Sequence, residues 1–182
     1  MNNFVSNYIE VLDDHFIRLR FGISHIKTNY VKKSGKWKLR DNFSKKYNSQ
    51  KSCLYFNHID LTLKQDCALS IYRLLDKRTD VISMKSLIES IETNENLVKE
   101  YNSICGLSEF NKIKELRNKK LGHISEENVE TSANENDLIV LYDRLENLYK
   151  RTRSQITRNP TQHPIEETIQ SCKEFWVEIV NF

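Results

Sequence analysis

Glycine and proline are scarce in this chain, with only four and two among 182 residues. Turn-rich β folds depend on these two residue types, so their scarcity argues against such a fold. No apolar run approaches the roughly 18 residues that a membrane-spanning helix needs. The glycine-rich phosphate loops of kinases and nucleotide-hydrolysing enzymes are also missing. These absences favour a helical protein that is not embedded in a membrane.

Cysteine is present but shows no pattern, because the four residues lie far apart at positions 53, 67, 105 and 172. No CxxC pair occurs, and no histidine stands at zinc-finger spacing from a cysteine. The first ten residues lack the basic start and the apolar stretch of a signal peptide. We therefore expect a cytoplasmic protein with reduced thiols, no metal site and no cofactor.

Apolar residues recur at helical spacing along most of the chain, which predicts an all-α, up-and-down bundle forming one domain over residues 1–182. The expected helices cover residues 3–30, 52–76, 84–91, 95–104, 108 to 121 or 122, and 136–157. A last helix is expected to start at Pro164, with Ile165, Ile169, Cys172, Trp176 and Ile179 on its apolar side. Ser83 and Ser108 are predicted N-caps, and Ser132 with Glu135 a capping box.

The segment between the first two helices is strongly basic, although the net charge of the chain is only +3. Nine basic residues between positions 27 and 51 face one acid, Asp41, and four aromatic residues are interleaved with them. We expect an irregular or short-helical connection, with a small hairpin around Gly35 as the alternative.

Basic and aromatic side chains together suit RNA, because cations neutralise phosphates and rings stack on unpaired bases. A solvated basic loop and a site for an acidic protein are the alternative interpretations. The candidate RNA-binding residues are Lys32, Lys33, Lys36, Trp37, Lys38 and Arg40, together with Lys119 and Lys120 near the motif described next.

The most distinctive stretch runs from Lys112 to Ser125 and reads KIKELRNKKLGHIS. On the predicted helix, Arg117 falls in the middle of the apolar arc. An arginine cannot shed its charge and is costly to bury unpaired. It must therefore pair with a carboxylate of a neighbouring helix, extend to the rim of the apolar face, or bind an anion.

Two neighbours of Arg117 favour the anion. His123 can take a proton from a ribose 2′-OH or give one to a leaving oxygen, and Asn118 adds a neutral donor and acceptor. On an ideal helix His123 would point about 120° away from Arg117. Gly122 can end or bend the helix and so reduce that angle. An exposed histidine at a helix C-terminus is the alternative interpretation of His123.

Arg117-Asn118 followed by His123 resembles the motif of the HEPN superfamily, which is Arg, a polar residue, and then His after four to six intervening positions. A second stretch, ALSIYRLLDKRTDVISMKSL from Ala68 to Leu87, resembles the abortive-infection U-type (AbiU-like) branch of HEPN proteins. In that branch a long helix ends in an Arg-Leu-Leu-Asp-like turn before a short helix that opens on Ser. The resemblance extends over most of the chain.

The resemblance implies a metal-independent endoribonuclease that acts as a toxin or phage-defence effector and cleaves RNA by 2′-OH transesterification. Its catalytic residues would be Arg117, Asn118 and His123. One histidine cannot be acid and base at once, so we expect a homodimer with a composite site. RNA, with tRNA as one candidate, and an antitoxin or regulatory protein are the expected partners. The alternative is a catalytically inactive HEPN-like module that binds a partner protein or a nucleotide.

Other polar residues are expected to be structural. His15 and His58 are predicted to be hydrogen-bonded core or rim residues, whereas His25 has no context that assigns it a role. Arg73 is expected to brace the motif helix through a carboxylate. The acidic segment 125–135 is predicted to be a solvated loop, with a gate beside the site as the alternative.

Overall fold

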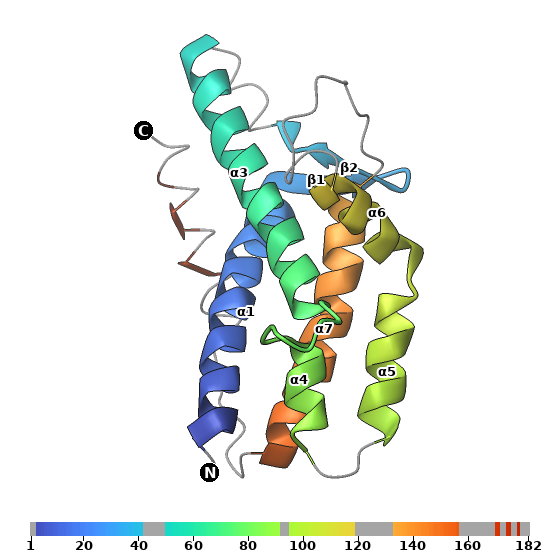
Figure 1. The fold of residues 1–182 in the computed structure, drawn as a ribbon. Coiled ribbons are helices and arrows are strands. Elements are labelled where there is room, and N and C mark those ends of the chain that lie inside the picture. Colours follow the sequence, from blue (N-terminus) through green and yellow to red (C-terminus); the bar gives the residue numbers. More distant parts are fainter. Residues whose placement is uncertain are drawn as a thin grey trace.

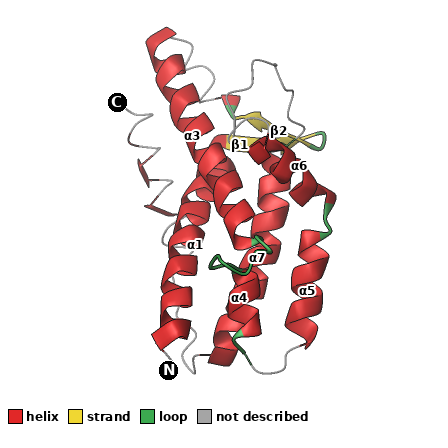
Figure 2. Cartoon of the chain, viewed as in Figure 1, coloured by secondary structure: helices red, strands yellow, loops and turns green. Residues whose placement is uncertain are grey.

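The structure is a computed structural model that describes residues 3–41, 50–91, 95–118 and 133–156, and five further residues between 170 and 178. This part of the chain contains six helices and one small hairpin, as Figure 2 shows. The helices are α1 (Asn3–Asn29), α3 (Gln50–Leu74), α4 (Met84–Glu89), α5 (Glu95–Cys105), α6 (Ser108–Leu116) and α7 (Glu135–Ile156). The hairpin pairs strand β1 (Tyr30–Lys33) with strand β2 (Lys36–Leu39) in antiparallel orientation.

The helices form an up-and-down bundle, which confirms the predicted fold class. Figure 1 shows α1 rising from the N-terminus to the hairpin, α3 and α4 descending, α5 and α6 rising, and α7 descending again. The core lies between α1, α3 and α7, and its centre includes Leu12, Phe16, Leu19, Ile71, Leu141 and Leu145, none of which is exposed. Among the helices described, none is long and apolar enough to cross a membrane.

Helices α1 and α3 approach each other closely at Gly22. A Cβ atom at this position would overlap the Cys67 sulfur and lie 3.1 Å from the Leu63 carbonyl oxygen. This close approach explains a glycine in the middle of a long helix, where glycine otherwise costs stability. Burial raises the pKa of Cys67 to about 12, so the thiol stays protonated and packs as an apolar group.

The basic connection is a hairpin, so the expected irregular or short-helical form is wrong for residues 30–39 and the Gly35 alternative is confirmed. Ser34 and Gly35 form the turn, with φ angles of 51° and 78°. Positive φ at both central residues is typical of turns whose twist matches that of a two-stranded ribbon.

Some predicted helix starts differ from the observed ones. Ser83 precedes α4 as expected, and its backbone N–H donates to Ser86 Oγ at 2.9 Å. Ser108 is the first residue of α6 and not its cap, because Leu107 takes that position.

Helix α7 is capped by Asn134, whereas Ser132 of the predicted capping box lies outside the described residues. Asn134 Oδ1 accepts from the backbone N–H of Asn136 at 2.9 Å. In return, Asp137 Oδ2 accepts from the backbone N–H of Asn134 at 2.8 Å. This reciprocal pair satisfies N–H groups that the start of a helix leaves free. The helix predicted from Pro164 falls mostly on residues outside the described part.

Candidate functional site

Arg117 and Asn118 lie immediately after α6, where the backbone continues as a π-helical turn. The Arg117 N–H is directed at the carbonyl groups of both Ile113 and Lys114. π-Helical turns are rare and occur frequently at functional sites. Arg117 itself keeps helical angles, with φ of −60° and ψ of −48°, so the chain passes from α6 into this turn without a break at the motif.

The Arg117 side chain is half-buried and lies on an aromatic ring. Its guanidinium carbon is 4.9 Å from the centroid of the Tyr72 ring, and its Nη1 donates to Asn118 Oδ1 at 3.0 Å. Tyr72 is itself held by Phe110, a fully buried residue of α6 whose ring centroid is 6.5 Å away. The guanidinium is thus held by a ring face and a neutral amide.

Arg117 makes no ion pair within the described residues. The carboxylate of Asp76, which follows α3, is bound instead by Arg78, whose Nε and Nη2 lie 3.2 Å from Oδ1 and 2.9 Å from Oδ2. Burial raises the pKa of Asp76, but the hydrogen bonds and charge of Arg78, and the charge of Arg117, lower it overall. Arg117 therefore lies within electrostatic reach of Asp76 without being paired to it.

The remaining motif residues, His123, Lys119 and Lys120, lie outside the described residues, as does most of the acidic segment 125–135. Arg73 is exposed and forms no ion pair in the described part, so it does not brace α6 through a carboxylate as expected. His15 is buried, as predicted, but its Nδ1 has no hydrogen-bond partner in the described residues. Burial together with the charge of Arg73 lowers the pKa of His15. His58 is exposed, so the predicted core or rim position is wrong for it.

The candidate RNA-binding residues of the hairpin divide between its two faces. The register pairs Lys32 with Trp37 and Lys33 with Lys36, so successive pairs point to opposite faces. Trp37 is half-buried against the core on the inner face, beside Lys32. Lys33, Lys36 and Lys38 share the outer face and are exposed. Arg40 follows β2, is exposed, and its Nη2 lies 3.4 Å from the Lys27 carbonyl oxygen.

The first turn of α7 connects the hairpin to the motif helix. Lys32 Nζ donates to Asn136 Oδ1 at 3.1 Å, and Lys112 Nζ of α6 donates to Asp137 Oδ1 at 2.9 Å. Because Asn136 and Asp137 are neighbours, the basic hairpin and α6 are attached to the same helical turn. The two sequence-predicted regions are therefore held in a defined relation to each other.

A buried polar network beside these contacts was missed by the sequence interpretation. His25 Nε2 lies 2.8 Å from Asp60 Oδ1, and Lys64 Nζ lies 2.7 Å from Asp60 Oδ2. The same ammonium donates to Tyr30 at 2.9 Å and to Glu135 at 2.6 Å. Burial raises the pKa of Asp60, but hydrogen bonds from His25 and Lys64 lower it overall. Asp60 and Lys64 are four residues apart on α3, a spacing that could have indicated the pair.

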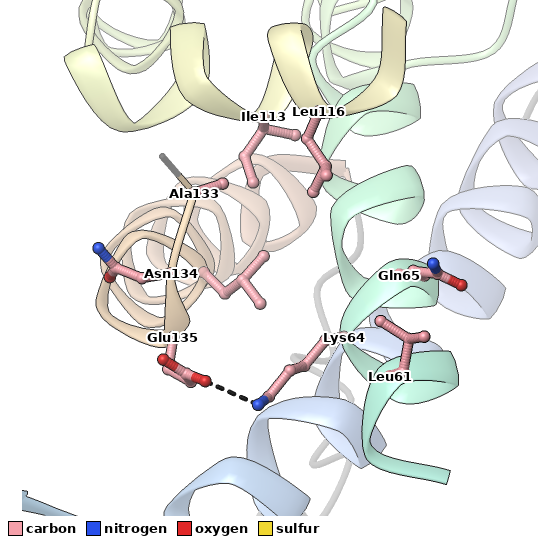
Figure 3. A pocket seen from close by; sticks show the side chains of 9 residues that line it. Leu61, Lys64, Gln65, Ile113, Leu116, Ala133, Asn134 and Glu135 are labelled. Atoms are coloured by element: carbon pink, nitrogen blue, oxygen red, sulfur yellow. Dashed lines mark hydrogen bonds and ion pairs between the residues drawn. The ribbon is translucent and has the colours of Figure 1, made fainter. Parts of the chain in front are cut away.

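The Lys64–Glu135 pair borders a small cavity between α3, α6 and α7, shown in Figure 3. The cavity has a volume of about 130 Å³ and is walled mainly by apolar side chains, including Leu61, Ile113 and Leu116.

His25 is only 1% exposed, so it is a structural residue of this region and cannot contact a substrate.

The fold is a HEPN-like helical bundle, and comparison with known families assigns it more narrowly. A family model named HEPN_AbiU2 and described as AbiU2 matches residues 5–175. The chain therefore belongs to the AbiU2 family, whose members carry an abortive-infection HEPN domain. This confirms the resemblance stated from the two sequence stretches. Comparisons with curated proteins and with solved structures give no match.

The Lys64 network predicts a stability effect. Replacing Lys64 with Met removes the cation that Asp60 and Glu135 share and leaves two partly buried carboxylates close together. We expect the free energy of unfolding at pH 7, measured by urea denaturation, to fall by about 3 kcal/mol. The control is Lys99→Met, because Lys99 and Glu95 form a pair with side-chain exposures of 75% and 89%. The free energy of unfolding of Lys99→Met should fall by less than about 0.5 kcal/mol.

This effect should also depend on pH. The pKa of Asp60 is lowered in the folded protein, so its stabilising contribution is present above its unfolded pKa of about 4. That contribution is lost as the pH falls through the folded-state pKa. The difference between wild type and Lys64→Met should therefore shrink below about pH 4. A difference that stayed constant in acid would contradict the role assigned to Asp60.

Proposed function

We propose that this AbiU2-family protein is a metal-independent endoribonuclease and that Arg117 binds the scissile phosphate. The proposal rests on the position, exposure and partners of the Arg117 guanidinium. It lies at the end of α6, is half-exposed, rests on Tyr72, and pairs with no carboxylate in the described part of the chain. A partly dehydrated cation of this kind is suited to an anionic ligand.

The proposed reaction is attack of a ribose 2′-oxygen on the neighbouring phosphorus, with loss of the 5′-oxygen. His123 takes the proton from the 2′-OH or gives one to the leaving 5′-oxygen. Arg117 neutralises the charge that grows on the phosphate oxygens, and Asn118 orients Arg117 or His123. The products are a 2′,3′-cyclic phosphate and a 5′-OH end. A homodimer that brings two motifs together supplies the second proton-transfer group.

The exposed face of the hairpin is the proposed path for RNA outside the motif. Lys33, Lys36 and Lys38 point outward together, and the hairpin is attached through α7 to the helix that carries Arg117. Contacts of this kind attract the phosphate backbone without reading its sequence. Activity on host RNA, tRNA included, gives the protein the role of a toxin or phage-defence effector, held in check by an antitoxin or regulatory protein.

The test of the reaction is cleavage of total RNA and tRNA by the purified protein in excess EDTA. Arg117→Ala should lower kcat by about 10²–10³-fold, and His123→Ala by about 10²–10⁴-fold. The matched control is Arg144→Ala, which removes an exposed arginine of α7 and should leave cleavage unchanged. Absence of cleavage by a folded, dimeric wild type would favour the alternative, an inactive module that binds a partner protein or a nucleotide.

The proposed role of the hairpin in RNA binding is tested by changing Lys33, Lys36 and Lys38 together to Gln. We expect KM for RNA to rise with kcat preserved, because these residues attract substrate and do not touch the reacting atoms. A plot of log binding constant against log salt concentration should become less steep by about two units, because each of the three lost phosphate contacts contributes about 0.7 to the slope. The same change at three exposed cations elsewhere, Lys99, Arg144 and Lys150, is the control. An equal effect of both triple variants would show only a general charge effect.

A further inference from the structure

Two pairs of polar side chains lie where α3 ends: Tyr72 with Arg117, and Asp76 with Arg78. Tyr72 and Asp76 are four residues apart, and the helical turn continues past Leu74 because the Asp76 N–H donates to the Arg73 carbonyl at 3.2 Å. Arg117 lies on the Tyr72 ring. Arg78 binds Asp76. Arg117, through the Tyr72 ring, and Asp76 are thus both placed at the C-terminal end of α3, and no ion pair joins them in the described residues.

The Asp76 carboxylate would compete with a phosphate for the Arg117 guanidinium. Asp76 is only 8% exposed, and a carboxylate in such a position is strongly attracted to any nearby guanidinium. A fork-like pair with Asp76 would use the N–H groups of Arg117 that a phosphate needs.

Arg78 prevents this by occupying both oxygens of Asp76. Its Nε lies 3.2 Å from Oδ1 and 3.1 Å from Oδ2, its Nη2 lies 2.9 Å from Oδ2, and its backbone N–H lies 3.0 Å from Oδ1. The carboxylate is thereby saturated with donors from one residue.

The Tyr72 ring attracts Arg117 without occupying its N–H groups. A ring face attracts a guanidinium through its electron-rich surface and leaves the edge of the cation free. Of the five N–H donors of an arginine, one is taken by Asn118 and the others have no partner in the described residues. The Tyr72 ring lies in turn beside the buried Phe110 ring, with 6.5 Å between the centroids.

We propose that Tyr72 and Arg78 are positioning residues for Arg117: the Tyr72 ring holds the guanidinium in place, and Arg78 keeps Asp76 from pairing with it. The proposal rests on the proposed function, because the group for which Arg117 is kept free is an RNA phosphate. A direct contact between Arg78 and RNA is the competing explanation, since the Arg78 side chain is 63% exposed.

A double-variant series separates these explanations. Arg78→Ala should lower kcat by about tenfold or more, because Asp76 then captures Arg117. The pair Arg78→Ala with Asp76→Asn should restore kcat to within about twofold of wild type, since the amide carries no charge. The Asn oxygen still accepts the residue 78 backbone N–H, which protects the fold. An unaffected Arg78→Ala variant, or a double variant as slow as the single one, would overturn the role of Arg78.

The ring is tested by a second pair of variants. Tyr72→Phe keeps the ring face and should retain kcat within about twofold, whereas Tyr72→Leu should lower kcat by about tenfold with KM little changed. Equal activity of the Phe and Leu variants, both folded by circular dichroism, would overturn the role of Tyr72.

A measurement independent of cleavage keeps the proposal testable if the wild type cuts no RNA. The side-chain Nε–Hε signal of Arg117 can be followed by ¹⁵N NMR. In Arg78→Ala the signal should shift downfield and exchange more slowly as the pair with Asp76 forms, and it should revert in the double variant. No change of this signal in Arg78→Ala would refute the positioning role, whereas absent cleavage with the expected shift would count only against the proposed function.

Discussion

The ammonium group of Lys64 joins the segments that surround the candidate site. This group joins Asp60 of its own helix to Tyr30 of the hairpin and to Glu135 at the start of α7, and Asp60 continues the connection to His25 of α1. The first turn of α7, fixed in this way, holds the hairpin through Asn136 and α6 through Asp137. A partly buried charge thus links α3, the hairpin and the start of α7, to which α6 is attached in turn. Such a network is costly to form and more costly to break, because each removed partner leaves another charge uncompensated.

Among the buried and half-buried arginines that the structure describes, Arg117 alone has no carboxylate partner in the described residues. Arg20 and Glu146, only 7% and 6% exposed, pair with each other between α1 and α7. Lys64 has two carboxylates, and Arg153 is paired with Asp13. Arg117 has an aromatic face and a neutral amide instead, although Asp76 is near enough for its pKa to respond to the charge. A half-buried cation with no carboxylate partner in the described residues forgoes the stability of an ion pair, a pattern that occurs often at functional sites.

Local signals made most of the fold predictable, whereas contacts between distant segments did not follow from them. Apolar periodicity places the ends of α1 and α3 within two residues, and Ser34-Gly35 indicates the turn of the hairpin, because these signals are contained in a few neighbouring residues. The role of His25 depends on Asp60, 35 positions later, and the packing of Tyr72 against Arg117 joins residues from different helices. Wheel geometry could show that Arg117 needs an explanation, but not whether a carboxylate or a ring supplies it. The cap of α7 was misplaced because Asn134 and Ser132 are both good N-cap residues.

The reaction we propose is attack by a ribose 2′-OH, promoted by Arg117 and His123. The most direct test compares an RNA that the protein cleaves with the same RNA carrying a 2′-deoxy nucleotide on the 5′ side of the cleaved bond, both in excess EDTA. We expect cleavage of the all-ribose strand to a 2′,3′-cyclic phosphate and a 5′-OH end, and no cleavage at the substituted position. Cleavage of the 2′-deoxy strand at the same bond would rule out transesterification, because the nucleophile would then be water and not the ribose oxygen.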